Sequence, residues 1–119
     1  MWYNRICIEQ VHGNSAFVYT DICKEAVNPY GGLHGGMIAS LADCAAGAAA
    51  CSDGTRYVTM SSTMNYLKTA ADGRVRAKAE VRWKGKRTAM VSVELFDCYD
   101  QLLACGTYTM YSVEKGTQA

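Results

Sequence analysis

Residues 34–51 read HGGMIASLADCAAGAAAC, a histidine and two glycines followed by a run of small apolar residues. The density of Ala, Met and Leu favours a helix, and the length of the run argues against a strand. A helix that is apolar on nearly every side has to be enclosed by the rest of the chain. One charged residue, Asp43, lies near the middle of the run. The segment therefore predicts a central helix with a carboxylate that needs an explanation.

The rest of the chain has the patterns of β-strands. Residues 74–83, RVRAKAEVRW, alternate polar and apolar side chains, so one face of this strand is expected to be buried and the other solvated. Further strands are expected at residues 6–11, 15–20, 57–66, 88–96 and 102–113. Turn residues 12–14 join the first two into a hairpin, and residues 28–32, with the only proline and a glycine pair, are expected to form a loop.

The expected order is therefore two strands, one helix and four strands, without an internal repeat or a linker. The sheet is the only material available to enclose the helix. We expect a single α+β domain over residues 1–119, in which one antiparallel sheet curls around a long central helix. The hot-dog fold is the leading candidate for this description.

Composition and charge exclude several classes of function. The chain has 12 basic and 11 acidic side chains in 119 residues, a net charge of +1, which argues against nucleic-acid binding. The first ten residues lack the apolar segment of a secretory signal. The apolar run is too short for a membrane span and carries a charge at its centre. We therefore expect a cytoplasmic protein without a membrane partner.

Six cysteines are many for this length, but they form no C-x-x-C pair and only two histidines accompany them. The spacing of a zinc finger or zinc ribbon is absent, so a metal site is not expected. Reduced cysteines acting as small apolar residues are the leading interpretation. A metal site or a regulatory disulfide is the alternative.

The start of the predicted helix suits an anionic ligand. Gly35 and Gly36 let another molecule approach the backbone, where the first turn of a helix has unpaired N–H groups and the positive end of the helix dipole. Such a site favours an anion, or an oxygen that becomes negative during a reaction. In the alternative interpretation, the glycines only permit a tight turn and close packing.

Asp43 is the sharper signal, because a lone carboxylate is costly to bury unless it is paired or hydrogen-bonded. It is either satisfied by neighbours such as Ser40 or used as an acid or base. Gly35 lies eight residues before it, about 12 Å along the axis at a rise of ~1.5 Å per residue. One substrate atom cannot contact both residues. If both act on one carbonyl, they come from two chains, which predicts a symmetric dimer with two composite sites.

The segment NPYGGLHGG at residues 28–36, followed by LAD at residues 41–43, resembles a known signature. It is similar to the N-x-x-G-x-x-H-G-G…D motif of the phenylacetic-acid-degradation (PaaI-like) acyl-CoA thioesterases of the hot-dog superfamily. The order of elements agrees over residues 5–113. The resemblance implies hydrolysis of a small aryl- or medium-chain acyl-CoA to free coenzyme A and a carboxylic acid. It also implies a homodimer or homotetramer that needs no cofactor, because coenzyme A is part of the substrate.

The resemblance also implies catalytic roles for single residues. Asp43 would act as general base on water or attack the thioester directly, and both routes stay open. The backbone N–H of Gly35 would stabilise the oxyanion. Asn28 would orient the water or the thioester, and His34 would line the site near the leaving sulfur. Each of the last two also fits a conformational role, Asn28 in a turn before proline and His34 at the helix start.

Two strand residues are candidates to face Asp43. Family members place a Ser or Thr on the first strand after the helix, and counting back from Tyr66 puts that position at Thr59. Ser61, two residues later and expected on the same strand face, is the fallback. Thr59 as an ordinary strand residue is the alternative.

The phosphates of coenzyme A would need cations. In the resembled family the hairpin at residues 82–87 lies beside the nucleotide, and this chain carries basic residues around a glycine there: Arg82, Lys84, Gly85, Lys86 and Arg87. Gly36 is a further candidate for substrate binding, and Lys68 is a second candidate cation. A solvated turn is the alternative for any single member of the hairpin.

Two other functions are alternatives for this fold. A hot-dog module could bind acyl-CoA without hydrolysing it, but such a module has no need for Asp43 beside a thioester. A hydratase of this fold would need a different helix-start motif. Thr69 stands where relatives usually carry proline, which affects the expected loop geometry but not the chemistry. The preferred acyl group stays open.

Overall fold

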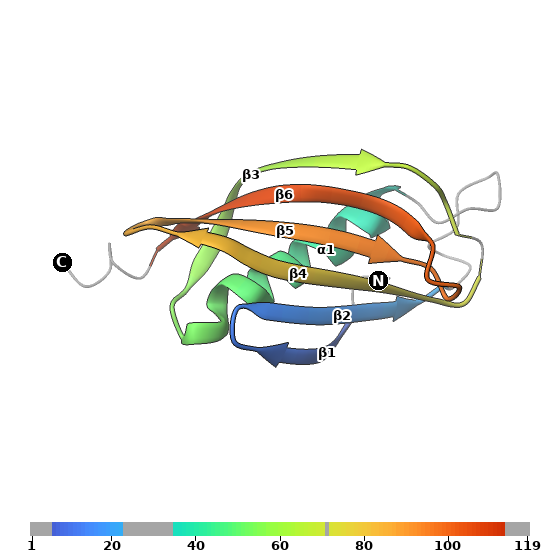
Figure 1. The fold of residues 1–119 in the computed structure, drawn as a ribbon, viewed down its shortest axis with the longest axis horizontal. Helices are drawn as coiled ribbons and strands as arrows, with labels where there is room; N and C mark the ends of the chain where they lie inside the picture. Colours follow the sequence, from blue (N-terminus) through green and yellow to red (C-terminus); the bar gives the residue numbers. More distant parts are fainter. Residues whose placement is uncertain (1–5, 23–34, 71, 114–119) are drawn as a thin grey trace.

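The computed structural model describes residues 6–22, 35–70 and 72–113 (Figure 1). Its elements follow the expected order, and each predicted strand boundary lies within one residue of the observed one. The elements are β1 (Cys7–His12), β2 (Ser15–Asp21), α1 (Gly35–Ala50), a 3₁₀ turn η3 (Cys51–Asp53), β3 (Tyr57–Tyr66), β4 (Arg74–Lys84), β5 (Thr88–Phe96) and β6 (Leu102–Ser112). The 3₁₀ turn was not predicted. The predicted loop at residues 28–32 lies outside the described residues.

The strands form one antiparallel sheet in the order β1-β2-β4-β5-β6-β3. Sequence neighbours pair as hairpins at β1–β2, β4–β5 and β5–β6. Between β3 and β4 the chain passes β6 and β5, so β3 forms the edge next to β6 (Figure 1). The other edge is β1. The first strand after the helix is therefore an edge strand.

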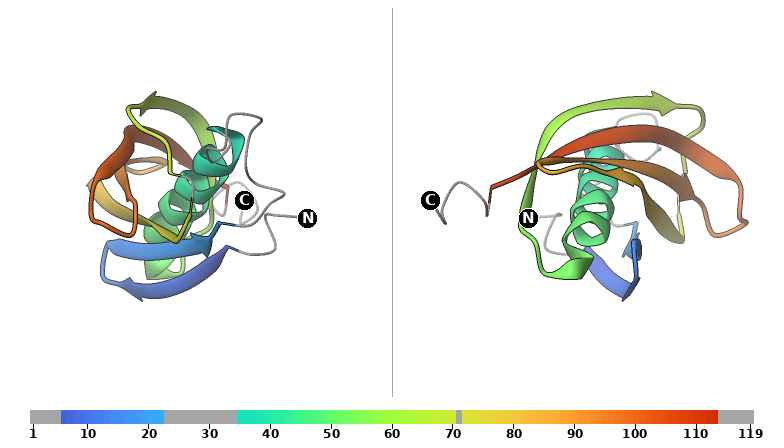
Figure 2. Two further views of the ribbon diagram at one scale, coloured as in Figure 1. Left: turned by 90° about the vertical axis from the view of Figure 1, so that its right-hand side faces the viewer. Right: turned by 60° about the vertical axis from the view of Figure 1, so that its left-hand side comes forward.

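Helix α1 packs against one face of the sheet (Figure 2). Its contact face consists of small and medium apolar residues at helical spacing, which are fully or almost fully buried: Met37, Ile38, Leu41, Ala42, Ala45, Ala46, Ala49 and Ala50. The alanines allow a close approach to inner-face strand residues such as Val18, Val91 and Leu95, which are also buried. This layer of helix on sheet forms the core.

The opposite face of α1 is accessible in the single chain. Gly36, Asp43 and Cys44 are exposed there, and Ala39 and Gly47 are partly exposed. The expectation that the sheet encloses the helix on nearly every side is therefore wrong for one chain. The physical reason is that the sheet covers the alanine-rich face and leaves this second face open.

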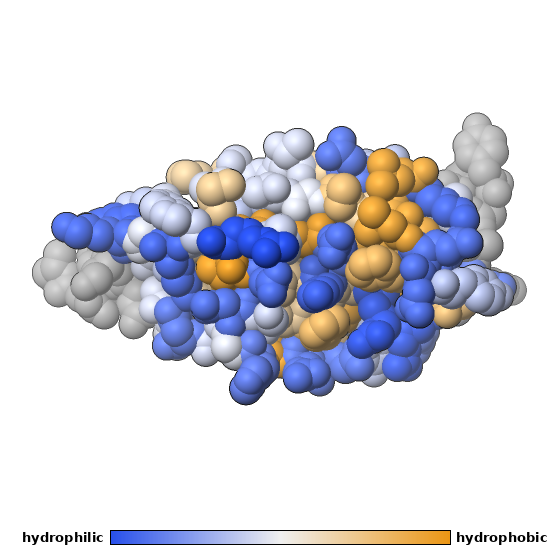
Figure 3. Space-filling view, in the orientation of Figure 1, coloured by the Kyte–Doolittle hydropathy of each residue, from blue (hydrophilic) through white to orange (hydrophobic). Residues whose placement is uncertain are grey.

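The outer face of the sheet carries the polar half of the predicted alternation. Val75, Ala77 and Ala79 of β4 are fully buried, whereas Arg74 and Arg76 point outward and pair with carboxylates of β2 and β1. Figure 3 shows polar groups over this side of the sheet and apolar groups gathered toward one end of β3 and β6. Within the described residues, no helix is both long and apolar enough to span a membrane.

Candidate active site

Asp43 lies in the middle of α1 on its accessible face. Its side chain is exposed in the single chain, so the premise that its own chain buries it is wrong. The edge strand β3 reaches this side of the helix, where its Thr59 contacts Asp43. The carboxylate is thus available to a molecule arriving from outside.

Thr59 of β3 faces Asp43, which is the placement that the family resemblance implied. Its hydroxyl donates a hydrogen bond of 2.5 Å to Oδ1 of Asp43. This distance falls in the usual range of about 2.5–2.7 Å for a hydroxyl bonded to a carboxylate. Thr59 lies opposite Met110 of β6, and the Met110 sulfur is 3.6 Å from the same hydroxyl. The contact fixes one carboxylate oxygen and leaves Oδ2 for another partner.

Ser61 does not share this face, and the fallback placement is wrong. The pairing of β3 with β6 shifts between Thr59 and Ser61, which is the mark of a β-bulge. The extra residue places Ser61 opposite Thr109, on the outer face, and Ser62 opposite the buried Tyr108, on the inner face. The inner positions are therefore Thr59 and Ser62.

Tyr108 of β6 is a site residue that the sequence analysis missed. Its side chain is 3% exposed, and its hydroxyl donates to the Ala39 carbonyl of α1 at 3.3 Å. Burial, followed by the negative charge of Asp43, raises the pKa of Tyr108 to about 12. The signal that could have found it is its position in β6, where alternation places a hydroxyl among inward apolar residues.

Cys44 follows Asp43 on the accessible face of α1. Partial removal from water and the adjacent Asp43 charge raise the pKa of its thiol. The thiol is therefore protonated near neutral pH and is a weak nucleophile. Asp43 is the stronger candidate for chemistry on this face.

The glycines at the start of α1 are open to contact. Gly35 and Gly36 are exposed, and a Cβ built on either would meet no atom within 4 Å. Because α1 is continuous from Gly35 to Ala50, the expected separation of about 12 Å between Gly35 and Asp43 holds. Asn28 and His34 lie outside the described residues.

Lys84 already has a partner in the single chain. Its ammonium pairs with Asp53 of η3 at 2.6 Å and lies 5.4 Å from the centre of the Tyr57 ring. Lys84, together with the backbone N–H of Thr55, lowers the pKa of Asp53 to about 2. The pair ties the end of β4 to the end of the helix. Gly85 follows, and the Trp83 ring covers it so closely that a Cβ there would collide.

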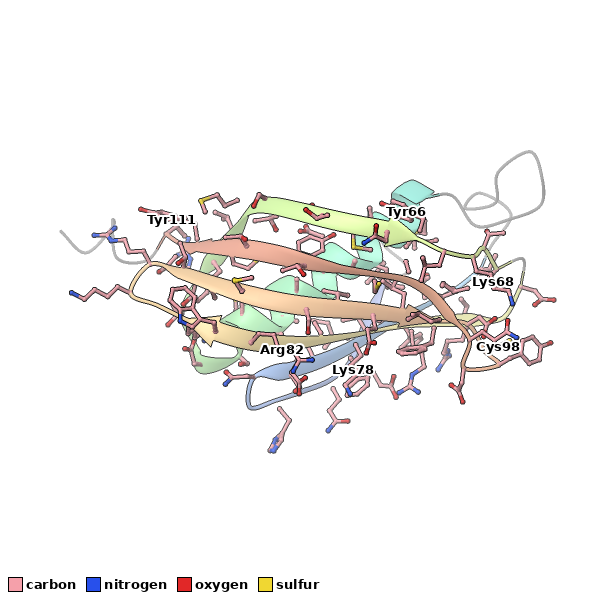
Figure 4. All side chains as sticks on the ribbon, turned by 45° about the horizontal axis from the view of Figure 1, so that its top comes forward. Tyr66, Lys68, Lys78, Arg82, Cys98 and Tyr111 are labelled. Carbon is pink, nitrogen blue, oxygen red and sulfur yellow. The ribbon has the colours of Figure 1, made fainter. Side chains whose placement is uncertain are left out.

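The remaining cations of this hairpin point to solvent. Lys86 and Arg87 are exposed, and Arg87 lies 3.5 Å from the Tyr111 hydroxyl. Arg82 bonds instead to Ser92 and Glu80 on the outer face. Figure 4 shows Arg82 and Tyr111 toward the hairpin end of the sheet.

Strand register places the hairpin level with Thr59. Lys84 pairs with Ala89, Ala89 with Met110, and Met110 with Thr59 across four adjacent strands. Three strand spacings of ~4.8 Å separate the ends of this row by about 14 Å. Lys68 lies at the opposite end of the sheet, where it bonds to Gln101 (Figure 4). The sheet therefore brings Thr59 and the hairpin to one end, and Lys68 to the other.

The described residues contain no group of three or more His, Cys, Asp or Glu side chains that could hold a metal ion. The groups available for chemistry on this face are a carboxylate, a hydroxyl that orients it and an open helix start. Such a set can activate water or attack a carbonyl carbon, provided that a donor for the resulting oxyanion is close.

Comparison with known proteins gives consistent matches. A family model described as the thioesterase superfamily matches residues 30–104. The acyl-coenzyme A thioesterase PaaI of Escherichia coli K12 is 30% identical over 90 residues, which are 75% of this chain and 64% of that protein. Its solved structure has a TM-score of 0.88 at 27% identity and covers 91% of this chain and 79% of its own. A hypothetical thioesterase protein of Streptococcus pneumoniae TIGR4, solved with coenzyme A, has a TM-score of 0.88 at 27% identity. The match covers 94% of this chain and 88% of that protein.

Proposed function

Because this chain belongs to the thioesterase superfamily and is a thioester hydrolase, we propose that it cleaves acyl-coenzyme A to free coenzyme A and a carboxylic acid. The expected resemblance to PaaI-like hot-dog thioesterases is confirmed by the family match and by the similarity to PaaI. The observation that carries the proposed chemistry is the hydrogen bond from Thr59 to Asp43 on an accessible helix face.

Asp43 is the proposed catalytic carboxylate. Thr59 donates to Oδ1, and in this proposal Oδ2 is the oxygen that acts on the reactant. Oδ2 either takes a proton from the attacking water or attacks the thioester carbon itself. In both routes the negative charge moves onto the thioester oxygen, which then needs a donor.

Gly35 of a second copy is the proposed donor. Gly35 is exposed with open space around it at the first position of α1, and the helix dipole favours an oxyanion there. Within one chain, the separation of about 12 Å along the helix prevents both residues from contacting one carbonyl. We therefore place Gly35 of one copy against Asp43 of the other.

The edge strand β3 is the proposed contact between the two copies. In the described chain β3 pairs on one side only, with β6, and Val58 and Met60 are 49% and 56% exposed along it. A free edge with exposed apolar side chains is suited to pairing with another strand. Because Thr59 belongs to this strand, pairing at β3 brings the second copy next to Asp43. A homodimer is the minimum assembly, and a homotetramer is compatible with it.

Asn28 and His34 precede Gly35 in the chain and would enter the composite site with it. Asn28 is proposed to orient the water or the thioester, and His34 to lie near the leaving sulfur. Gly36 is proposed to leave room for the thioester beside Gly35, because a Cβ there would occupy open space.

Lys86 and Arg87 are the proposed contacts for the coenzyme A phosphates. Both are exposed in the hairpin at the end of the sheet that carries Thr59. Lys84 contributes less in this proposal, because its ammonium is already paired with Asp53. Gly85 shapes the turn beneath Trp83. The solved relative with coenzyme A supports this class of substrate.

The first test is thiol release from a panel of aryl- and alkyl-acyl-CoAs. We expect release by the wild type and a loss of about 100-fold or more in kcat for Asp43→Asn, which keeps the size of the side chain. Asp72→Asn, in the exposed loop before β4, is the matched control and is expected to keep wild-type activity. Binding of acyl-CoA without release would support a binding module instead. Equal kcat for wild type and Asp43→Asn would reject Asp43 as the catalytic carboxylate.

The second test asks whether the site combines two chains. Gly35→Pro removes the N–H at the first helical position, where proline is tolerated. Each variant alone is expected to be inactive. In a heterodimer of Gly35→Pro with Asp43→Asn, one site has both groups intact and the other has neither. Co-expression with random pairing should therefore restore about a quarter of wild-type activity. No recovery would contradict the two-chain site.

A further inference from the structure

Tyr108 occupies a position that connects the sheet to the turn of α1 carrying Asp43. Its ring lies on the inner face of β6 and its hydroxyl reaches the carbonyl of Ala39 at 3.3 Å. In an α-helix the carbonyl of residue 39 also accepts the N–H of residue 43. The Tyr108 hydroxyl and the backbone amide of Asp43 therefore converge on one oxygen atom.

We propose that Tyr108 is a positioning residue that holds the Asp43 turn of α1 in place against β3, an inference that rests on the proposed thioesterase function. It does not contact the substrate. It acts by fixing the backbone from which the carboxylate extends toward Thr59.

The same two strands hold both partners of the catalytic hydrogen bond. Thr59 pairs with Met110, and Ser62 pairs with Tyr108, across β3 and β6. Met110 contacts the Thr59 hydroxyl through its sulfur at 3.6 Å, and Tyr108 contacts the helix turn of Asp43. Strand β6 therefore contacts both sides of this bond through two residues two positions apart: Met110 at the donor, and Tyr108 at the helix turn of the acceptor.

The hydroxyl of Tyr108 is not explained by packing alone. A phenylalanine would fill the same volume, and a buried hydroxyl is costly unless it is hydrogen-bonded. The bond to the Ala39 carbonyl satisfies this hydroxyl. Since burial and the Asp43 charge raise the pKa of Tyr108 to about 12, the hydroxyl remains protonated and acts as a donor near neutral pH.

Positioning has a direct consequence for rate. Small displacements of a catalytic group reduce turnover because the reacting atoms no longer lie in the productive geometry. The loss should appear in kcat rather than in KM, because the substrate contacts themselves are unchanged. The loss of kcat should also require Thr59, because a shifted helix turn lowers kcat by weakening the bond between Thr59 and Asp43.

The test compares Tyr108→Phe with Tyr99→Phe, a control in the turn between β5 and β6 whose side chain is 76% exposed. Thiol release from the best acyl-CoA should show kcat reduced about fivefold for Tyr108→Phe, with KM within about twofold of wild type. Tyr99→Phe should match the wild type. In a Thr59→Val background, the Tyr108 substitution should have almost no further effect on kcat.

Three outcomes would overturn the inference. The first is an unchanged kcat in Tyr108→Phe, and the second is an equal reduction with and without Thr59→Val. If Tyr108→Phe fails to fold, Tyr108→Met removes the hydroxyl with a flexible apolar side chain, and an unchanged kcat in that variant is the third. Absence of thiol release by the wild type would reject the proposed function. If the wild type releases thiol and Tyr108→Phe has the same kcat, only this inference is rejected.

Discussion

Replacing Thr59 by valine tests the central contact of the site. Valine keeps the branched shape but lacks the hydroxyl that donates at 2.5 Å to Asp43. We expect a lower kcat because the carboxylate loses the bond that orients it, and a nearly unchanged fold because both side chains are exposed in the single chain.

The size of the effect follows from the geometry. Hydrogen bonds to charged groups contribute about 1.5–3 kcal/mol when they are shielded from solvent. Because Asp43 is exposed, water replaces part of this bond, and about 1–2 kcal/mol is a reasonable loss in the transition state. At ~1.36 kcal/mol for each tenfold change in rate, kcat should fall roughly 5- to 30-fold.

Steady-state thiol release with acyl-CoA provides the assay, and two variants provide its controls. Thr59→Ser restores a hydroxyl and should recover most of the activity. Thr63→Val makes the same chemical change on the outer face of β3, opposite Thr107, and should behave as the wild type. The reasoning would be refuted by wild-type kcat in Thr59→Val, or by serine and valine variants that lose activity equally.

Three further predictions concern stability and binding. Lys84 and the Thr55 N–H lower the pKa of Asp53 from 3.8 to about 2, so the pair stabilises the fold above pH ~4 and this stabilisation is lost as the pH falls through 2. Asp53→Asn should lower the free energy of unfolding in urea by under ~1 kcal/mol at pH 6 and by much less at pH 2, and an equal decrease at both pH values would contradict this prediction. Gly106→Ala should destabilise by about 1–3 kcal/mol in urea unfolding, because its Cβ would collide with the backbone of β3, and a neutral result would show that β3 moves freely. Replacing Lys86 and Arg87 by alanine should raise KM for acyl-CoA but not for an acyl thioester without the nucleotide, and equal changes for both substrates would exclude phosphate contacts.

The strands could be predicted because their patterning is local. Residues 74–83 alternate polar and apolar side chains, and the structure buries Val75, Ala77 and Ala79 as expected. Alternation failed where the chain inserts an extra residue. The bulge in β3 transfers the inner position from Ser61 to Ser62, and nothing in the local composition marks it.

In the candidate site, too, local features could be predicted and contacts between distant residues could not. The spacing of Gly35 and Asp43 on one helix was enough to predict their separation, because the rise of an α-helix is constant. The placement of Thr59 depended on a family resemblance. Tyr108 was missed because its partner, Ala39, is 69 residues away and belongs to the helix backbone, which has no sequence signal.

Local sequence patterns were enough to predict the elements, their order and the helix with its glycine start and central carboxylate, since periodicity and helix geometry depend on neighbouring residues. The packed fold sets the order of strands in the sheet, the accessible side of α1, the pairing of Lys84 with Asp53 and the contact of Tyr108 with the helix. These features depend on contacts between residues far apart in the chain. Each of these features depends on which surfaces stay uncovered after the core has packed, and local sequence patterns carry no information about those surfaces.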